Sequence, residues 1–269
     1  MTLNIINPKN KIGVGIITYN REDLFYECLK SLPFADEIVV VNDGKEFKNT
    51  KNLSNINHII QHDKNYGVAK SKNDALKYLL KQGCENIFLC EDDVKIINEN
   101  VFEEYIKASE TSGIQHLNYA YHGPTNKNNI SHYQEIKYEK GVGLSFHRYP
   151  IGAFTFYTRT AIEKVGLLDE RFHNFHDHVD HTARFIKAKL HPPYGWFADI
   201  VSSDKFISDQ DPELSRSTNK RNTLNYSLKY YYYYLKYILK NGNPKVAEFT
   251  ELHSYLINLK SKNKYNFVK

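Results

Sequence analysis

The sequence NIFLCEDD, residues 86–93, places three consecutive carboxylates directly after an apolar run. The run predicts a buried strand, and the carboxylates predict a polar loop at its end. Because side chains alternate along an extended chain, we expect Glu91 and Asp93 to point one way and Asp92 the other. Adjacent carboxylates repel one another, and a hard divalent cation shared with substrate phosphates would relieve that repulsion. The alternative interpretation is a solvated acidic turn.

Strands and helices alternate on either side of this stretch. Short apolar runs predict buried strands, and apolar residues at helical spacing predict amphipathic helices. This alternation indicates a parallel sheet with right-handed crossovers. The further predicted strands are residues 11–18, 37–41, 56–60, 151–157 and 196–201, and the predicted helices are residues 21–32, 67–80, 160–165 and 177–190.

Polar clusters follow three of the predicted strands. Residues 18–20 (TYN), 42–43 (ND) and 91–93 (EDD) each stand where a strand ends. Ligands of such sheets collect at the carboxyl ends of the strands. We therefore expect the three clusters to converge on one crevice.

Four segments occur in a characteristic order: IITYNR at 16–21, VVVNDG at 39–44, NYGVAKSKN at 65–73 and FLCEDD at 88–93. In these motifs and their spacing the sequence resembles the inverting glycosyltransferases of family 2, over roughly residues 11–200. The resemblance implies an α/β protein with the GT-A fold, a Rossmann-like and mainly parallel sheet flanked by helices. Asn42 departs from the family, which usually has an Asp there.

The resemblance also implies roles for individual residues. Asp93 would be the main ligand of Mn²⁺ or Mg²⁺, with Glu91 beside it, and Asp92 would touch ribose or metal. Such an ion can stabilise the diphosphate leaving group as a Lewis acid. Lys70 and Lys72 have an alternative interpretation as ordinary solvated helix lysines. The implied residues that bind the donor nucleotide are Thr18, Asn20, Arg21, Asp43, Lys70, Asn73 and Asp92.

The segment DHVDHTAR, residues 177–184, is similar to the family's E-D-x-D-x-x-x-R, which contains the base that deprotonates the acceptor. His178 stands where the family's catalytic Asp usually lies. The candidate bases are therefore Asp177 and His178, with Asp180 third, since Asp180 and Arg184 are spaced for a structural i,i+4 pair. The four histidines between residues 173 and 181 also admit a zinc interpretation, which we consider weaker because no further ligand spacing supports it.

Composition and chain ends limit the class of protein. The chain has 269 residues, 41% hydrophobic and 25% charged, which is typical of a soluble globular protein. No signal peptide is recognisable, and three cysteines without metal-site spacing fit a reducing cytoplasm. A net charge of +5 is too small to indicate nucleic acid as a partner. We expect a GT-A domain at 1–216, with a nucleotide-binding half (about 1–110) and an acceptor half (about 111–216), followed by a helical extension at 217–269.

The extension is basic and rich in tyrosine. It holds ten Lys and Arg residues against two Glu, and residues 230–234 are five consecutive tyrosines. Tyrosine and lysine suit a membrane interface. The alternative, which we favour, is that the helix packs on the α/β body or on a second subunit with its tyrosines half buried. The expected apolar stripe consists of Leu224, Leu228, Tyr231, Leu235 and Ile238.

Together these features predict a metal-dependent inverting glycosyltransferase of the hexosyltransferase type. Its donor would be a nucleotide-sugar, UDP-linked by preference, and its acceptor a glycan or lipid-linked glycan in bacterial-type surface polysaccharide synthesis (capsule or lipopolysaccharide). We expect a cytoplasmic protein, either free or peripheral at the inner face of the cell membrane. The alternatives are a nucleotidyltransferase that acts on a sugar phosphate and a non-catalytic carbohydrate-binding protein on a degenerate transferase fold.

Overall fold

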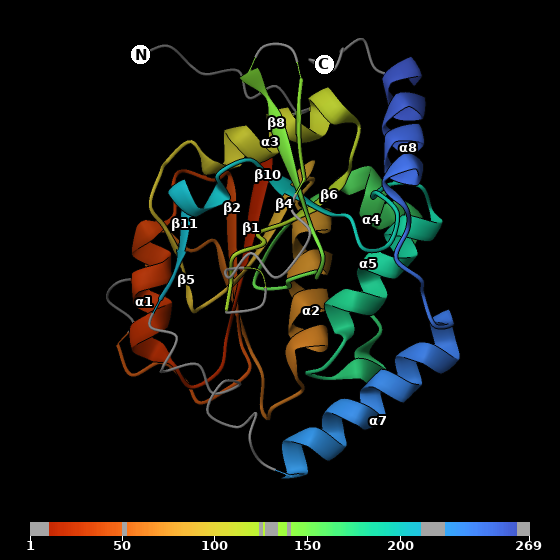
Figure 1. The fold of residues 1–269 in the computed structure, drawn as a ribbon. Coiled ribbons are helices and arrows are strands. Elements are labelled where there is room, and N and C mark those ends of the chain that lie inside the picture. The colour runs from red at the N-terminus through yellow and green to blue at the C-terminus, as the bar shows by residue number, and fades with distance from the viewer. Residues whose placement is uncertain are drawn as a thin grey trace, which may run out of the picture.

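A central sheet organises the protein (Figure 1). The structure is a computed structural model, and it describes residues 11–49, 53–123, 126, 134–138, 141–210 and 224–262. The sheet has six strands in the order β3-β2-β1-β4-β9-β6. Strands β1 to β4 are mutually parallel, whereas β9 runs antiparallel to both β4 and β6. The strands are β1 (Ile12–Thr18), β2 (Glu37–Asn42), β3 (His58–Gln61), β4 (Asn86–Glu91), β6 (His116–Asn118) and β9 (Phe154–Thr158). The predicted α/β class with a mostly parallel sheet is confirmed.

Helices cover both faces of this sheet because its strands are apolar on both sides. Val14 and Ile16 of β1 pack on the side of α1 (Glu22–Ser31) and α3 (Val101–Ser112). Ile17, together with alternate residues of β2 and β4, packs on the side of α2 (Val68–Lys81), α4 (Arg159–Val165) and α5 (Asp177–Lys187). Figure 1 shows α1 on one side of the sheet and α2 and α5 on the other.

Glycine lets α2 approach the middle of the sheet. A Cβ at Gly15 of β1 would lie 2.8 Å from Cβ of Ala75 in α2 and 2.9 Å from Leu89 Cδ2. A larger residue at this position would push the helix outward. Because α2 begins beside the strand ends, this close packing fixes the position of its first turns relative to those ends.

Two small sheets extend the body. One has the order β10-β8-β7, and the other pairs β11 with β5 in antiparallel fashion. In the second sheet Asp209 stands opposite Val94, so β11 lies beside the segment that follows the carboxylate triplet. The strands are β5 (Val94–Ile96), β7 (Gln134–Lys137), β8 (Gly143–His147), β10 (Phe197–Ile200) and β11 (Ile207–Asp209), with short 3-10 helices η3 (Glu170–Phe172) and η4 (Ser203–Lys205).

Two helices form the C-terminal region, α7 (Leu224–Asn241) and α8 (Phe249–Lys262). The predicted break near residues 241–244 separates them, while the expected helix start near residue 217 lies outside the described residues. Leu252 and Leu256 of α8 join the apolar core on the α3 side. Within the described residues, no helix combines the length and apolar character that a bilayer-spanning segment needs. Cys28, Cys84 and Cys90 are buried free thiols.

Candidate functional site

The carboxyl ends of β1 and β4 bring three of the predicted site residues together. Thr18, the last residue of β1, donates its hydroxyl to Asp92 Oδ2 at 2.7 Å. Arg21 follows the same strand, and its guanidinium pairs with the Asp92 carboxylate and, at 2.8 Å, with Asp93 Oδ2. Asp92 is completely buried and Asp93 is 4% exposed. The predicted convergence of the first and third polar clusters is therefore present as direct contacts.

The expected alternation of the three carboxylates is wrong. β4 ends at Glu91 and the chain turns there, so Asp92 and Asp93 both reach Arg21. Glu91 instead faces α2, where Lys72 Nζ donates to its Oε1 at 2.8 Å. The regular up-and-down pattern of an extended chain applies only while the chain stays extended.

Arg21 neutralises a buried acidic pair. Burial raises the pKa of Asp92 to about 7, although the Arg21 charge and the Thr18 hydrogen bond act in the opposite direction. Burial also opposes the charge on Arg21, but Asp92 and Asp93 outweigh it and raise the Arg21 pKa. Removing one partner of such a buried pair is costly, because it leaves an uncompensated charge. Arg21 thus holds the position of a counter-ion between the two carboxylates.

The surroundings of Asp93 suit a hard divalent cation. Asp93 Oδ1 is buried and accepts no hydrogen bond, and His122 Nε2 lies 3.9 Å from it. His122 Nδ1 is 2.7 Å from Asp209 Oδ1. Burial would lower the pKa of His122, but the Asp209 hydrogen bond and the Asp93 charge raise it. Carboxylate oxygens suit Mn²⁺ and Mg²⁺.

These residues would form only part of a coordination shell. Nowhere in the described portion of the chain do three or more His, Cys, Asp or Glu side chains converge as a ready-made metal site. An ion at Asp93 would therefore need further ligands from water or from substrate phosphates, as is usual for Mg²⁺-type sites. The chemistry of the residues present fits such a shared site.

Sequence reasoning missed His122 and Asp209. Asp209 also accepts the backbone N–H of Gly123 at 2.9 Å, which fixes the loop that carries His122. Neither residue belongs to a recognisable spacing, because they lie 87 positions apart and meet only through the pairing of β5 with β11. A three-residue strand leaves too little periodicity to be read from the sequence.

Asp43, directly after β2, holds the loop between β3 and α2. Its carboxylate accepts the backbone N–H groups of Tyr66 and Gly67, each at 2.8 Å, and one oxygen lies 2.7 Å from His62 Nδ1. Asn20 stands nearby with a left-handed backbone and accepts the Lys45 N–H at 2.8 Å. Asp43 and Asn20 thus fix the loops beside the strand ends, and their contacts with a nucleotide stay a prediction.

Lys70 and Asn73 are engaged elsewhere on α2. Lys70 pairs with Asp74 one turn further along the helix. Asn73 is buried, donating its side-chain amide to the Leu168 carbonyl and to Glu170 while accepting the Leu168 N–H at 2.8 Å. Asn73 therefore anchors the segment before η3, and the structure does not bring it to the Asp92–Asp93 pair.

Lys72 is a buried cation that joins two parts of the site. It is 2% exposed, so its interpretation as a solvated helix lysine is wrong. Its Nζ donates to Glu91 Oε1 and to the Gly152 carbonyl, both at 2.8 Å, and lies 3.9 Å from Asp177 Oδ2. Burial opposes this charge, but the Glu91 and Asp177 carboxylates outweigh it and raise the Lys72 pKa.

Two of the three candidate bases lie at this junction. Asp177 begins α5, is 3% exposed, and its Oδ2 accepts no hydrogen bond. His178 Nδ1 is 3.6 Å from Asp177 Oδ1, and the His178 ring packs against Gly152, where a Cβ would lie 2.8 Å from Cγ. Burial would raise the pKa of Asp177, but His178 and Lys72 outweigh it and lower the value. Asp177 is therefore a carboxylate at neutral pH.

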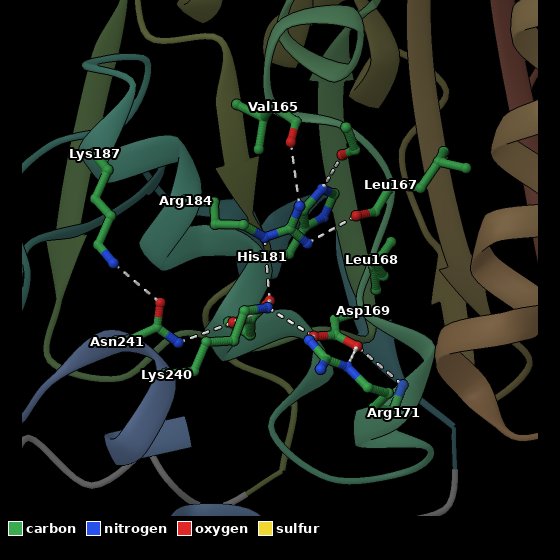
Figure 2. A network of polar contacts seen from close by, with 12 residues as sticks. Val165, Leu167, Leu168, Asp169, Arg171, His181, Arg184, Lys187, Lys240 and Asn241 are labelled. Atoms are coloured by element: carbon green, nitrogen blue, oxygen red, sulfur yellow. Dashed lines mark hydrogen bonds and ion pairs between the residues drawn. The ribbon is translucent and has the colours of Figure 1, made fainter. Parts of the chain in front are cut away.

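Asp180 contacts the C-terminal helix α7, in a network that also holds Asp169 and Lys240 (Figure 2). It is fully buried, accepts Arg184 Nε at 3.1 Å, and receives Lys240 Nζ and Asn241 Nδ2 at 2.9 Å each. The predicted i,i+4 pair with Arg184 is thus present. Lys240 also donates to Asp169 Oδ2 at 2.8 Å, so this network attaches α7 to the body. A role for Asp180 as base stays a prediction that these contacts do not favour.

The histidines near α5 do not form a metal cluster within the described residues. His181 is fully buried, with Nε2 2.8 Å from the Gly166 carbonyl, and burial lowers its pKa to about 3. His173 packs against Gly67, where a Cβ would lie 2.8 Å from its Nδ1. The zinc interpretation receives no support from this arrangement.

Comparison with known proteins identifies the family. The model of Glycosyl transferase family 2 matches residues 13–166, more than half of the chain. The chain belongs to glycosyl transferase family 2. A curated relative, "Uncharacterized glycosyltransferase R363" of Acanthamoeba polyphaga mimivirus, is 27% identical over 218 residues, which cover 73% of this chain and 80% of the relative.

Solved structures confirm the GT-A-like fold of this glycosyl transferase family 2 member. S. aureus TarS 1-349 matches with a TM-score of 0.55 and 16% identity, over 94% of this chain and 72% of that chain. The mannosyltransferase PcManGT from Pyrobaculum calidifontis, solved with GDP-Man and Mn²⁺, matches with a TM-score of 0.59 and 12% identity, over 93% and 68%. The family places the protein among glycosyltransferases, as the sequence predicted.

Replacement of Lys72 tests the buried junction. Lys72→Met should lower the free energy of unfolding by about 3–5 kcal/mol, because it leaves the buried Asp177 and the partly buried Glu91 without their shared cation. Lys70→Met is the matched control: Lys70 belongs to the same helix, but its side chain is 30% exposed in its pair with Asp74. The control should lose only about 0–1 kcal/mol. Urea unfolding measures both values, and equal losses would contradict the assignment.

Proposed function

We propose that this glycosyltransferase is metal-dependent and inverting, and that it moves a sugar from a nucleotide-sugar donor to a hydroxyl of a glycan or lipid-linked glycan. The observation that carries the proposal is the buried Asp92–Asp93 pair at the carboxyl ends of β1 and β4, held by Arg21. A buried pair of carboxylates beside a guanidinium suits the binding of a metal-diphosphate group. The GDP-Man and Mn²⁺ bound by PcManGT support a donor and an ion of this kind.

The donor side of the crevice would be formed by residues of β1, β2, β4 and α2. Thr18, Arg21 and Asp92 contact one another directly and are the best supported of the proposed donor-binding residues. Asn20 and Asp43 line the neighbouring loop, while Lys70 and Asn73 have partners elsewhere and are the weakest proposals. UDP is the nucleotide that we propose first, with GDP as the direct competitor.

Asp93 would hold the ion, with His122 beside it. Glu91, the second proposed ligand, has one oxygen bound to Lys72 and is better placed to hold that lysine. Mn²⁺ or Mg²⁺ would act as a Lewis acid that stabilises the departing nucleoside diphosphate. Arg21 would exchange its carboxylate partners for the diphosphate, because a guanidinium binds carboxylate and phosphate oxygens in the same bidentate way.

Asp177 and His178 are our candidates for the base. Inverting transfer requires a group that accepts a proton as the acceptor oxygen attacks the anomeric carbon. Asp177 is ionised and its Oδ2 is free of hydrogen bonds, and His178 lies 3.6 Å from its other oxygen. Lys72 fixes the position of Asp177 and links it to the strand end that carries Glu91.

The wider role is also a proposal. We propose hexosyl transfer in bacterial-type surface polysaccharide synthesis, on the resemblance of the sequence. We also propose a division into a GT-A domain at 1–216 and an extension at 217–269. Family membership does not favour the nucleotidyltransferase alternative. A non-catalytic carbohydrate-binding protein would bind glycans without turning over any nucleotide-sugar.

Donor turnover tests the proposed function. In the presence of Mn²⁺, the wild type should release nucleoside diphosphate from a UDP- or GDP-sugar, and proton NMR should show an inverted anomeric configuration in the transferred sugar. Asp93→Asn should reduce the rate on the order of 100-fold, because it removes stabilisation of the leaving group. Asp204→Asn, at an exposed aspartate outside the site, is the control. Full activity of Asp93→Asn would overturn the proposal.

Replacement of Arg21 tests whether another cation can take its place beside Asp92 and Asp93. Arg21→Gln should be less stable than wild type by about 3–5 kcal/mol without metal, because two buried carboxylates lose their counter-ion. Mn²⁺ should restore much of that stability, since an ion that binds only the folded state raises its unfolding temperature. Lys30→Gln, at an exposed lysine of α1, the helix that begins directly after Arg21, should respond like wild type. Thermal unfolding with and without Mn²⁺ measures the effect, and an equal metal response in all three proteins would contradict it.

A further inference from the structure

Helix α7 carries an exposed apolar stripe on the face turned away from the body. Leu224, Leu228, Tyr231, Leu235 and Leu239 recur every three or four residues and therefore share one face of the helix. Their exposed fractions lie between 60 and 88%. We call these five residues the α7 stripe. Ile238, which the sequence assigned to the stripe, is half-buried against the body, and Leu239 takes its place.

The opposite face of α7 holds the helix in position. Tyr237 is 2% exposed, and Tyr233 stacks on Phe175 with ring centroids 5.5 Å apart. Lys240 and Asn241 bind Asp180 (Figure 2). The helix is therefore attached through tyrosines, Ile238 and polar groups, and its leucines remain outside. In Figure 1, α7 runs along the outside of the body next to α5.

Electric charge favours one kind of partner for the stripe. Residues 214–247 contain seven Lys and Arg residues and no Asp or Glu. Lys240 is paired with Asp169 and Asp180, whereas Lys229 is exposed and Lys236 binds only a backbone carbonyl and aromatic rings among the contacts described. A symmetric dimer through the stripe would bring two such basic segments together. An anionic partner is attracted by the same charges.

The stripe also has the composition and length of an interfacial helix. From Leu224 to Leu239 it extends about 22 Å along the helix axis, at 1.5 Å per residue. Leucines of such helices enter the boundary between headgroups and acyl chains, tyrosines lie at headgroup depth, and lysines meet anionic lipid. Beside the stripe, Lys229 and Tyr232 line an open groove together with His173 and Phe175. This groove offers a recess with donor groups next to the apolar surface.

We propose that the α7 stripe binds the surface of an anionic lipid bilayer, with α7 lying in the plane of the interface. The proposal does not depend on the donor, the metal or the reaction. In this arrangement α7 attaches the body to the membrane. The face of α7 opposite the stripe is fixed to α5 and to the residue before η3 by the Asp180 network.

Vesicle co-sedimentation of the full chain tests the proposal. Wild type should bind vesicles that contain phosphatidylglycerol more strongly than pure phosphatidylcholine vesicles, and added salt should weaken this binding. The triple variant Leu228→Gln/Leu235→Gln/Leu239→Gln should partition at least about tenfold less, because it loses the apolar surface that enters the lipid. Phe34→Gln/Ile97→Gln, which removes two exposed apolar side chains elsewhere, is the matched control and should bind like wild type.

A second variant keeps the test independent of the leucines. Lys220→Gln/Arg221→Gln/Lys229→Gln should lose most of the preference for anionic vesicles, because it removes basic charge beside and before the stripe. Unchanged circular dichroism and unfolding temperature verify that each variant is folded. Equal binding of wild type and triple variant, or no binding by wild type, would overturn the proposal. So would a concentration-dependent dimer in sedimentation velocity that the triple variant abolishes, because the stripe would then bind a second copy.

Discussion

The ion pairs of Arg21 with Asp92 and Asp93 are the interaction on which the site depends. Two carboxylates buried at the end of a parallel strand are tolerated only with a cation close to them. Arg21 supplies that cation from the end of the neighbouring strand, and Thr18 adds a hydrogen bond to Asp92. A protein that needs a cation at this point can exchange one cation for another. The ion pairs therefore stabilise the strand ends, and the proposed binding of a metal-bound diphosphate rests on them.

A second buried cation, Lys72, connects the end of β4 to the start of α5. Lys72 binds Glu91, which belongs to the carboxylate triplet, and approaches Asp177 at the start of α5. The end of β4 and the start of α5 are thus held in one network, with Lys72 Nζ as the shared cation. This network lies deep in the body, whereas the Asp180 network lies under α7 and attaches the C-terminal region. Asp177 and Asp180, three residues apart on α5, therefore have different partners: Asp177 lies near Lys72, and Asp180 binds Lys240 and Asn241.

The sequence predicted the features that depend on long apolar runs and on strand topology. The strands around residues 12–18, 37–42 and 86–91, and the meeting of Thr18 with Asp92, follow from those runs and from the rule that parallel strands end at one edge. The Leu168 partner of Asn73 and the Gly152 partner of Lys72 could not be predicted, because they lie 95 and 80 residues away. The contact between His122 and Asp209 was not predicted for the same reason, since they lie 87 residues apart. The face of α7 that points outward is set by the contacts of its tyrosines with the body, and not by hydrophobicity.

The most direct test of the central claim is to locate Mn²⁺ on the protein. Titration of Mn²⁺ with UDP into protein labelled at histidine should broaden the NMR signals of His122 first, because its Nε2 lies 3.9 Å from Asp93 Oδ1. The signals of His253 in α8 and His58 in β3, outside the site, should keep their width until the ion is in large excess. Selective broadening of His122, lost in Asp93→Asn, is the result that we predict. An unaffected His122 at saturating Mn²⁺ would contradict the account.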